Sequence, residues 1–249
     1  MIKPVFEYTK NMLPKETHYC PGCSHGIAHR ILVETLEERG EIGDAIGVSP
    51  VGCSITAHNY MNIDMIESPH GRAPAVASGI KRVHPNAPVF TYQGDGDLAS
   101  IGGNELLHVC ERGENITIIF INNAIYGMTG GQMAPTTLLG MKATTCSNGR
   151  TVEEQGMPMK MAELVAGFPG AVYVERCMMD TPQNIRKAKK AINRAFEVQK
   201  RKLGFSFVEL LCACPTNWGM TPENALKWIK TDMAAYYPVK QFRCPEEVK

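Results

Sequence analysis

A βαβ unit built around a Gly-Asp-Gly turn is the most constraining feature of this chain. An apolar, β-branched and aromatic run at 88–93 precedes the turn, helical apolar spacing covers 98–112, and a second buried-strand run covers 116–122. The two strands of such a unit are parallel, so their carboxyl ends meet at one edge of a sheet, where ligands of open α/β sheets bind. We therefore expect Asp95, in the turn, to lie close to the Asn pair at 122–123.

The residue types at these two strand ends suit a diphosphate held through a divalent cation. Gly94 and Gly96 allow a tight turn and a close approach of the backbone to phosphate, and the next helix offers free N–H groups to an anion. Magnesium takes oxygen ligands octahedrally, from one or two protein groups and from substrate phosphates. We expect Asp95, the amide oxygen of Asn123 and a nearby main-chain carbonyl such as that of Ile125 to bind it.

A dinucleotide site is the alternative for the same turn, because Gly94, Gly96 and Ala99 also satisfy the loose dinucleotide fingerprint. A nicotinamide site would place an acidic, ribose-binding residue at the end of the following strand. The sequence has the Asn pair at 122–123 there, followed by AIYGMTGGQ. The pattern therefore favours a site for a diphosphate and a metal ion.

Three motifs then occur together: CPGCSHG at 20–26, HGRAPAVASGIK at 70–81, and GDGD at 94–97 with INNAIYGMTGGQ at 121–132. In this combination and order they resemble the beta subunit of 2-oxoacid:ferredoxin oxidoreductases, which binds thiamine diphosphate, and the resemblance covers almost the whole chain. It implies that Asp95, Asn123 and the carbonyl of Ile125 bind magnesium. It also implies a set of residues that contact thiamine diphosphate: Cys23, Ser24, His25, Gly94, Asp95, Gly96, Asp97, Asn123, Ile125 and Thr129.

Two histidines of these motifs are candidate catalytic groups. His25 and His70 stand beside glycines, and an imidazole can titrate near neutrality or hydrogen-bond a phosphate or a substrate carboxylate. A purely structural role is the alternative for each.

Nine cysteines require an explanation in a chain that we expect to be cytoplasmic, where a disulfide framework is disfavoured. Cys20 and Cys23 flank a Pro-Gly turn, a spacing that lets both sulfurs reach one iron-sulfur cluster or one zinc ion. A thioredoxin-like dithiol and unrelated cysteines remain open. Cys53 and Cys214 follow strand-like runs, so we expect both to converge with the first pair.

The resemblance implies that these four cysteines, Cys20, Cys23, Cys53 and Cys214, bind one 4Fe-4S cluster, although some family members have none there. Cys146 or Cys212 could replace one of them. Cys110 and Cys177 fall among apolar residues and are expected to pack in the core.

The whole chain alternates helical and strand-like runs, which predicts a doubly wound parallel α/β sheet in a single thiamine diphosphate-binding domain at 1–249. That domain would carry the CPGC segment at its start and a helical tail at its end. The predicted helices cover 24–39, 74–84, 98–112, 158–168, 181–201 and 222–234, and the predicted strands cover 44–50, 88–93, 116–122, 171–176 and 205–212. Thr181-Pro182 and Thr221-Pro222 mark two helix starts, and 127–157 is expected to form a loop over the cofactor.

Composition excludes other classes. Residues 1–11 lack the pattern of a signal peptide, and no apolar run approaches the ~18 residues of a membrane span. A net charge of +1, without clusters of Arg and aromatic residues, argues against nucleic acid as a partner. We expect a cytoplasmic protein with no membrane contact.

The resemblance implies a partner. Thiamine diphosphate is activated by a carboxylate from a pyrimidine-binding domain, for which 249 residues leave no room, so an alpha subunit would supply it in at least a heterodimer. The implied reaction is oxidative decarboxylation of a 2-oxo acid to acyl-CoA and carbon dioxide, with electrons passing through the cluster to ferredoxin. Overall resemblance favours 2-oxoglutarate or branched-chain 2-oxo acids. The alternatives are a non-oxidative decarboxylase or carboligase subunit, and an electron-transfer or scaffold subunit with an unused thiamine site.

Overall fold

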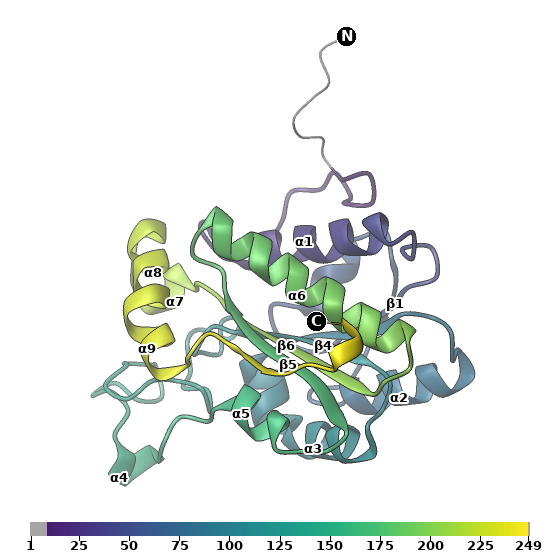
Figure 1. Cartoon of the computed structure of the whole chain (residues 1–249). Helices are drawn as coiled ribbons and strands as arrows, with labels where there is room; N and C mark the ends of the chain where they lie inside the picture. The colour runs from purple at the N-terminus through teal and green to yellow at the C-terminus, as the bar shows by residue number, and fades with distance from the viewer. Residues whose placement is uncertain (1–8, 249) are drawn as a thin grey trace.

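A seven-stranded sheet, in the order β2-β1-β3-β4-β6-β5-β7, forms the centre of the fold in a computed structural model that describes residues 9–248 (Figure 1). The strands from β1 to β6 are parallel to their neighbours, and β7 pairs antiparallel with β5 at one edge. The strands are β1 (Ile46–Ser49), β2 (Asp64–Glu67), β3 (Val89–Gly94), β4 (Thr117–Asn122), β5 (Ala171–Met178), β6 (Phe205–Leu211) and β7 (Gln241–Arg243).

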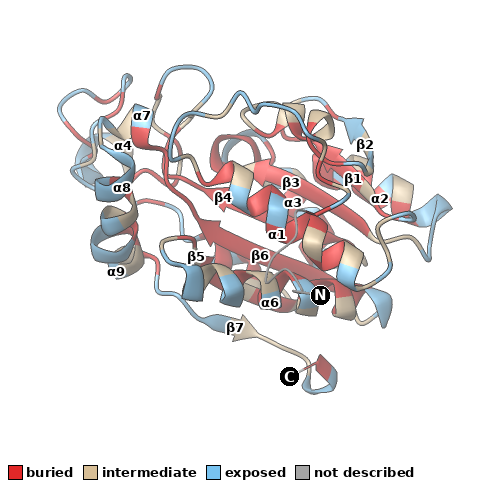
Figure 2. Ribbon diagram, turned by 90° about the horizontal axis from the view of Figure 1, so that it is seen from above, coloured by how far each residue is buried: buried red, intermediate tan, exposed pale blue. Residues whose placement is uncertain are grey.

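Helices cover both faces of the sheet, which explains why its central strands are apolar throughout. α1 (His25–Glu38) and α6 (Pro182–Lys200) pack side by side on one face. α2 (Ala73–Val83), α3 (Gly103–Arg112) and α5 (Met161–Ala166) contribute their apolar sides to the core on the other face. Figure 2 shows the result, with buried strands between helices whose outer sides are exposed.

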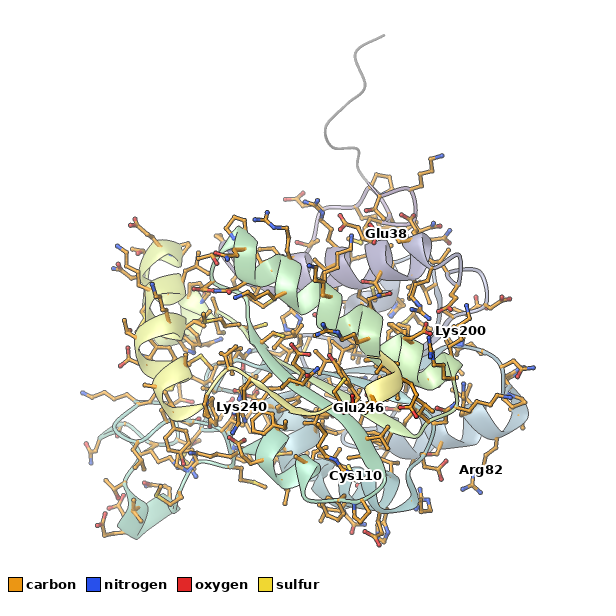
Figure 3. The ribbon with its side chains drawn as sticks, in the orientation of Figure 1. Glu38, Arg82, Cys110, Lys200, Lys240 and Glu246 are labelled. Atoms are coloured by element: carbon orange, nitrogen blue, oxygen red, sulfur yellow. The ribbon has the colours of Figure 1, made fainter. Side chains whose placement is uncertain are left out.

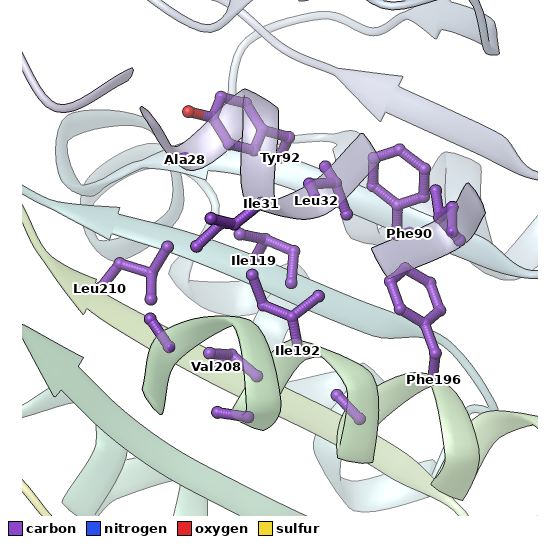
Figure 4. Close-up of a cluster of buried hydrophobic side chains, with 14 of the residues drawn as sticks. Ala28, Ile31, Leu32, Phe90, Tyr92, Ile119, Ile192, Phe196, Val208 and Leu210 are labelled. Carbon is purple, nitrogen blue, oxygen red and sulfur yellow. The ribbon is translucent and has the colours of Figure 1, made fainter. Parts of the chain in front are cut away.

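The core beneath α1 and α6 holds these layers together. Ile31 and Leu32 of α1 meet Ile192 of α6 over the central strands, and the rings of Phe90 and Phe196 pack edge to face with their centroids 6.0 Å apart (Figure 4). Fully burying a side chain of this size contributes about 1.5–3 kcal/mol. Charged side chains such as Glu38, Arg82 and Lys200 lie instead on the outside of the molecule (Figure 3).

Shorter elements lie in the connections and near the chain's end. They are η1 (Ile55–Asn59), η2 (Gly96–Ile101), α4 (Val152–Gln155), α7 (Pro215–Trp218), α8 (Pro222–Trp228), η3 (Ile229–Met233), α9 (Ala234–Tyr236) and η4 (Glu246–Val248), of which η2 and η3 are π-helical. Thr181 and Thr221 cap α6 and α8, each accepting a hydrogen bond from the main-chain N–H three residues later, so both predicted helix starts are confirmed.

The predicted doubly wound α/β sheet is confirmed, with two additions at its edges. Neither β2 nor β7 was predicted; β7 follows the helical tail, and Cys244 beside it packs against the core. None of the helices formed by residues 9–248 has the length and apolar content that a membrane span requires. Most of the segment assessed for a signal peptide, residues 1–8, lies outside the described part of the chain.

Candidate functional site

A pocket opens at the carboxyl edge of the sheet between β1 and β3. From β1 the chain runs outward to β2, whereas from β3 it runs the other way to β4, so the strand order reverses here. Crevices at such switch points are where open α/β sheets bind ligands. The pocket is lined by His25, His70, Val51, Gly52, Cys53, Ser54, Gly94, Asp95, Gly96, Asp97, Asn123, Ile125, Tyr126, Gly127, Met128 and Thr129.

Asp95 follows β3 directly and is buried against the floor of this pocket. Its Oδ1 accepts a hydrogen bond from the main-chain N–H of Gly96 at 2.9 Å, and its Oδ2 accepts one from the Thr136 hydroxyl at 2.6 Å. Burial raises the pKa of Asp95 to about 7, against the opposing effect of these donors. Within residues 9–248 no lysine, arginine or histidine forms an ion pair with it, so its charge is left for a ligand such as a cation.

Asn123 and Ile125 reach the same pocket from the end of β4. Between them Ala124 adopts a φ of 58°, the left-handed conformation that non-glycine residues rarely adopt. The turn is fixed from outside, because the Thr137 hydroxyl donates to the Ala124 carbonyl at 2.6 Å and the indole N–H of Trp218 donates to the Asn123 carbonyl at 3.0 Å. The structure thus brings Asp95, Asn123 and Ile125 together around one pocket.

Asp97 and His70 form a second polar group beside Asp95. Asp97 Oδ1 lies 2.5 Å from His70 Nδ1 and accepts a hydrogen bond from the Gly71 N–H at 2.7 Å, while Oδ2 accepts one from Gln93 Nε2 at 2.6 Å. Burial raises the pKa of Asp97, although these partners oppose the shift. The carboxylate is therefore engaged within the protein, and it orients the half-buried His70 ring at the pocket wall.

The other predicted contact residues divide between the pocket and its support. His25 lines the pocket, is buried, and shares its Nδ1 with the Tyr92 hydroxyl at 2.7 Å; burial lowers its pKa to about 3, so the ring is neutral. The Ser24 hydroxyl accepts the Ala213 N–H at 2.9 Å, which ties the CPGC segment to the end of β6. Thr129 lines the pocket near its exposed side.

Gly127 lies where the pocket meets two cysteines. A β-carbon on Gly127 would stand 3.3 Å from Cys53 Sγ, 3.6 Å from Cys214 Sγ and 3.7 Å from Asn123 Nδ2. Burial raises the pKa of Cys23 to about 12, and repulsion from the thiols of Cys214, Cys53 and Cys20 adds to the rise. The pKa of Cys53, about 11, rises for the same reasons. The structure therefore gathers all four cysteines in one region.

These thiols do not form a ready-made site for a single ion. Within the described residues no group of three or more His, Cys, Asp or Glu side chains is arranged to hold one metal ion, and the four cysteines of this region form no disulfides. A zinc ion would need four ligands drawn tightly around it, whereas a cluster of four irons is larger and is held by thiolates spaced around its outside. Cys110 and Cys177 are buried in the core away from this group, and Cys146 and Cys212 are also buried.

Several residues of the site gave no signal in the sequence. Thr136 and Thr137 lie in the irregular segment after the Asn pair, and Trp218 lies in α7, near the end of the chain. Each contacts the turn after β3 or β4 only because the chain folds back over the carboxyl edge. Buried Arg150 organises that segment by donating to main-chain carbonyls on both sides of it, at residues 134, 135, 137, 155, 156 and 157.

Comparisons with known proteins agree with this geometry. Residues 49–210 match the family of the thiamine pyrophosphate enzyme, C-terminal TPP binding domain. Ketoisovalerate oxidoreductase subunit VorA of Methanothermobacter thermautotrophicus is 46% identical over 242 residues, which are 97% of this chain and 51% of that protein. 2-Oxoglutarate synthase subunit KorB of Methanocaldococcus jannaschii is 41% identical over 219 residues, covering 85% of this chain and 76% of that protein.

A solved structure shares the fold. The 2-oxoglutarate:ferredoxin oxidoreductase from Magnetococcus marinus superposes with a TM-score of 0.79 at 24% identity, over 97% of this chain and 86% of that chain. The chain spans about half the length of VorA, 51%, but about three quarters, 76%, of KorB. Sequence and fold together confirm the family expected from the motifs: this chain belongs to the thiamine diphosphate-binding subunits of the 2-oxoacid:ferredoxin oxidoreductases.

Proposed function

We propose that this chain is the beta subunit of an enzyme that converts a 2-oxo acid and coenzyme A into acyl-CoA and carbon dioxide and reduces ferredoxin. The observation that carries the proposal is the position of Gly127, where a β-carbon would lie within 3.7 Å of Cys53, Cys214 and Asn123 at once. A thiol cluster and a diphosphate-type pocket thus share a wall. A non-oxidative thiamine enzyme would use the pocket but has no need of the thiols.

Asp95, the Asn123 amide oxygen and the Ile125 carbonyl would hold magnesium against the diphosphate. Asp95 supplies a buried carboxylate without a basic partner among the described residues, and Asn123 and Ile125 line the same pocket. Glycine is required at position 96, because a β-carbon there would stand only 2.4 Å from the Tyr126 ring. Gly94, Thr129 and the main chain at Asp97 would line the diphosphate.

Cys20, Cys23, Cys53 and Cys214 would bind a 4Fe-4S cluster. When bound, thiamine diphosphate supplies a nucleophilic carbon for the 2-oxo carbonyl, and the cluster takes up electrons one at a time. The nearness of these thiols supports the assignment, because the Cys214 and Cys20 thiols both contribute to the raised pKa values of Cys23 and Cys53, and an iron-sulfur cluster is bound by thiolates spaced around it. Asn217 Nδ2 lies 3.3 Å from Cys214 Sγ and would hydrogen-bond this ligand.

His70 and His25 would act on the substrate side of the pocket. Asp97 holds Nδ1 of His70, which leaves Nε2 to hydrogen-bond a phosphate or the carboxylate of a 2-oxo acid. His25 is neutral and shares its Nδ1 with the Tyr92 hydroxyl. It would therefore position the substrate or cofactor by hydrogen bonding and would not supply a positive charge. Cys23 and Ser24 support this wall from behind, since neither lines the pocket.

An alpha subunit would complete the active site with its pyrimidine-binding domain. The segment that follows the Asn pair exposes apolar side chains in the manner of a subunit interface: Met128 (50%), Leu139 (42%), Val152 (47%), Met157 (56%) and Met159 (37%). We also propose a cytoplasmic location, since Cys20, Cys23, Cys53 and Cys214 form no disulfides, which fits a reducing compartment. The names of the relatives favour a branched-chain 2-oxo acid or 2-oxoglutarate as substrate.

The test separates the two cofactors in the anaerobically assembled complex. Cys53→Ala should lose iron and the ability to reduce a low-potential dye, while magnesium-dependent binding of thiamine diphosphate persists. Asp95→Ala should lose that binding but retain iron, and Cys110→Ala, which changes a cysteine of the core, should retain both. Full iron content in Cys53→Ala, or undiminished cofactor binding in Asp95→Ala, would refute the corresponding assignment. Acyl-CoA formation with a panel of 2-oxo acids then identifies the substrate.

A further inference from the structure

A buried ion pair lies beneath the turn that follows β4. Glu209 of β6 and Arg176 of β5 are both fully buried, and Arg176 Nε stands 2.9 Å from Glu209 Oε2. Glu163, at the surface side, also pairs with Arg176. Burying charges costs so much that an apolar pair of similar volume is often no less stable. Stability alone is thus a weak reason for a carboxylate at position 209.

The second oxygen of Glu209 has a different partner. Asn122, at the end of β4, donates from Nδ2 to Glu209 Oε1 at 2.7 Å. This contact fixes the orientation of the Asn122 amide, with its nitrogen toward Glu209, because only the NH₂ group can donate to a carboxylate. The amide oxygen is consequently turned toward the following residues, where it accepts the N–H of Ala124 at 3.2 Å.

Ala124 is the residue whose conformation needs such support. Its φ of 58° is disfavoured for a residue with a β-carbon, and it lies between Asn123 and Ile125, the two members of the turn proposed to face magnesium. If Ala124 relaxed to an ordinary negative φ, the Asn123 side chain and the Ile125 carbonyl would no longer face the same point. The left-handed residue therefore sets the geometry of two of the three oxygen donors.

We propose that Glu209 is a positioning residue for the magnesium site, which it orders through Asn122 and the left-handed turn at Ala124. The inference rests on the proposed function, because it assigns to that site the buried group that shapes it. Glu209 does not line the pocket, and its influence passes through one amide whose two ends have different partners.

The experiment measures the magnesium concentration that half-saturates thiamine diphosphate binding, by calorimetry on the assembled complex. Glu209→Gln has a single amide oxygen, which Arg176 attracts, so its NH₂ group would face the donating NH₂ group of Asn122 and the link would be lost. This change should raise the magnesium concentration roughly ten-fold, which is the size of the penalty for a left-handed residue. Asn122→Ala breaks the same link without disturbing Arg176 and should have the same effect. Glu163→Gln is the matched control: it weakens the same arginine's ion pairing without touching Asn122, and should leave the concentration unchanged.

Glycine gives the decisive variant, because it adopts a positive φ without penalty. Adding Ala124→Gly to Asn122→Ala should return the magnesium concentration to within about three-fold of the unmodified complex, a rescue that a loss of general stability would not show. If the magnesium concentration were unchanged in Glu209→Gln and Asn122→Ala, or if glycine did not restore it, the role of Glu209 would be refuted while the proposed function would stand. Absence of magnesium-dependent binding by the unmodified complex would overturn the proposed function, and this inference with it.

Discussion

Asp95 and Asp97 stand two residues apart, yet the fold gives their carboxylates opposite surroundings. Asp95 receives a hydroxyl and main-chain N–H groups but no basic side chain among the described residues, and burial raises its pKa to about 7. Asp97 is equally buried but is held by His70, Gly71 and Gln93. One carboxylate is therefore available to a cation, whereas the other is part of the scaffold.

This contrast predicts opposite effects of two matched substitutions. Asp95→Asn should raise the thermal midpoint of the metal-free complex at pH 8 by about 2–4 °C, corresponding to about 1 kcal/mol, because a buried charge without a basic partner is removed. Asp97→Asn should lower the midpoint, since one of its oxygens becomes a donor facing the donors of Gly71 and Gln93. Thermal unfolding in the presence of a chelator measures both. A lower midpoint for Asp95→Asn would contradict the reasoning.

Burial of His29 should make the protein less stable at low pH. It is fully buried in α1, and burial lowers its pKa well below 6.5, so the folded state keeps it neutral. The unfolded chain takes up a proton below about pH 6.5. Stability is therefore lost as pH falls below that value. His29→Leu should make the decline in thermal midpoint between pH 7 and pH 5 shallower, with the remainder owed partly to His25; an unchanged slope would show that His29 does not contribute.

At the level of elements, a helix or strand could be predicted where the residues that specify it are close together in the sequence. Thr181 and Thr221 cap their helices through residues three positions away, so the sequence contains the whole motif. β2 and β7 span only four and three residues and have no fully buried side chain, so neither shows the pattern of a strand; each exists because a neighbouring strand offers free main-chain groups.

The same reasoning explains the site. Asp95 and Asn123 were predicted to converge because the carboxyl ends of parallel strands meet at one edge, a rule that needs no side-chain detail. Thr136, Trp218 and Glu209 could not be predicted, since they reach the same turns from distant segments and their partners depend on how loops pack. Sequence therefore located the residues that line the pocket and are proposed to contact a ligand, and the structure was needed for the residues that orient them.

Arg150 is expected to order the loop at residues 134–157, which covers the carboxyl edge of the sheet. Its buried guanidinium donates to six carbonyls between residues 134 and 157, which gives an otherwise irregular segment a single anchor. Arg150→Met should leave those carbonyls without a donor and increase amide hydrogen exchange across 134–157 at least ten-fold in the assembled complex. Arg82→Met, which changes an exposed arginine of α2, should not. Unchanged exchange in Arg150→Met would show that packing alone orders the loop.

For the molecule as a whole, the two proposed cofactor sites lie next to each other around Gly127, and the proposed function depends on this arrangement. Cys53 follows β1, Asn123 follows β4 and Cys214 follows β6, so three strands of one sheet deliver their ends to the same point. A parallel sheet makes this possible because all its carboxyl ends face one way. The proximity would suit transfer of single electrons from the proposed site of decarboxylation to the proposed cluster.

Gly127→Ala tests whether both sites depend on that packing. The added methyl would stand 3.3 Å from Cys53 Sγ, which is tighter than ordinary contact, and 3.7 Å from Asn123 Nδ2, which is ordinary contact. Cys53 or the main chain that carries the methyl must therefore shift by a few tenths of an ångström. Iron content and magnesium-dependent cofactor binding should therefore weaken together, each by several-fold. Gly103→Ala, where a β-carbon meets nothing within 4 Å, is the control and should change neither. If Gly127→Ala altered one property and spared the other, packing at this position would not couple the two sites.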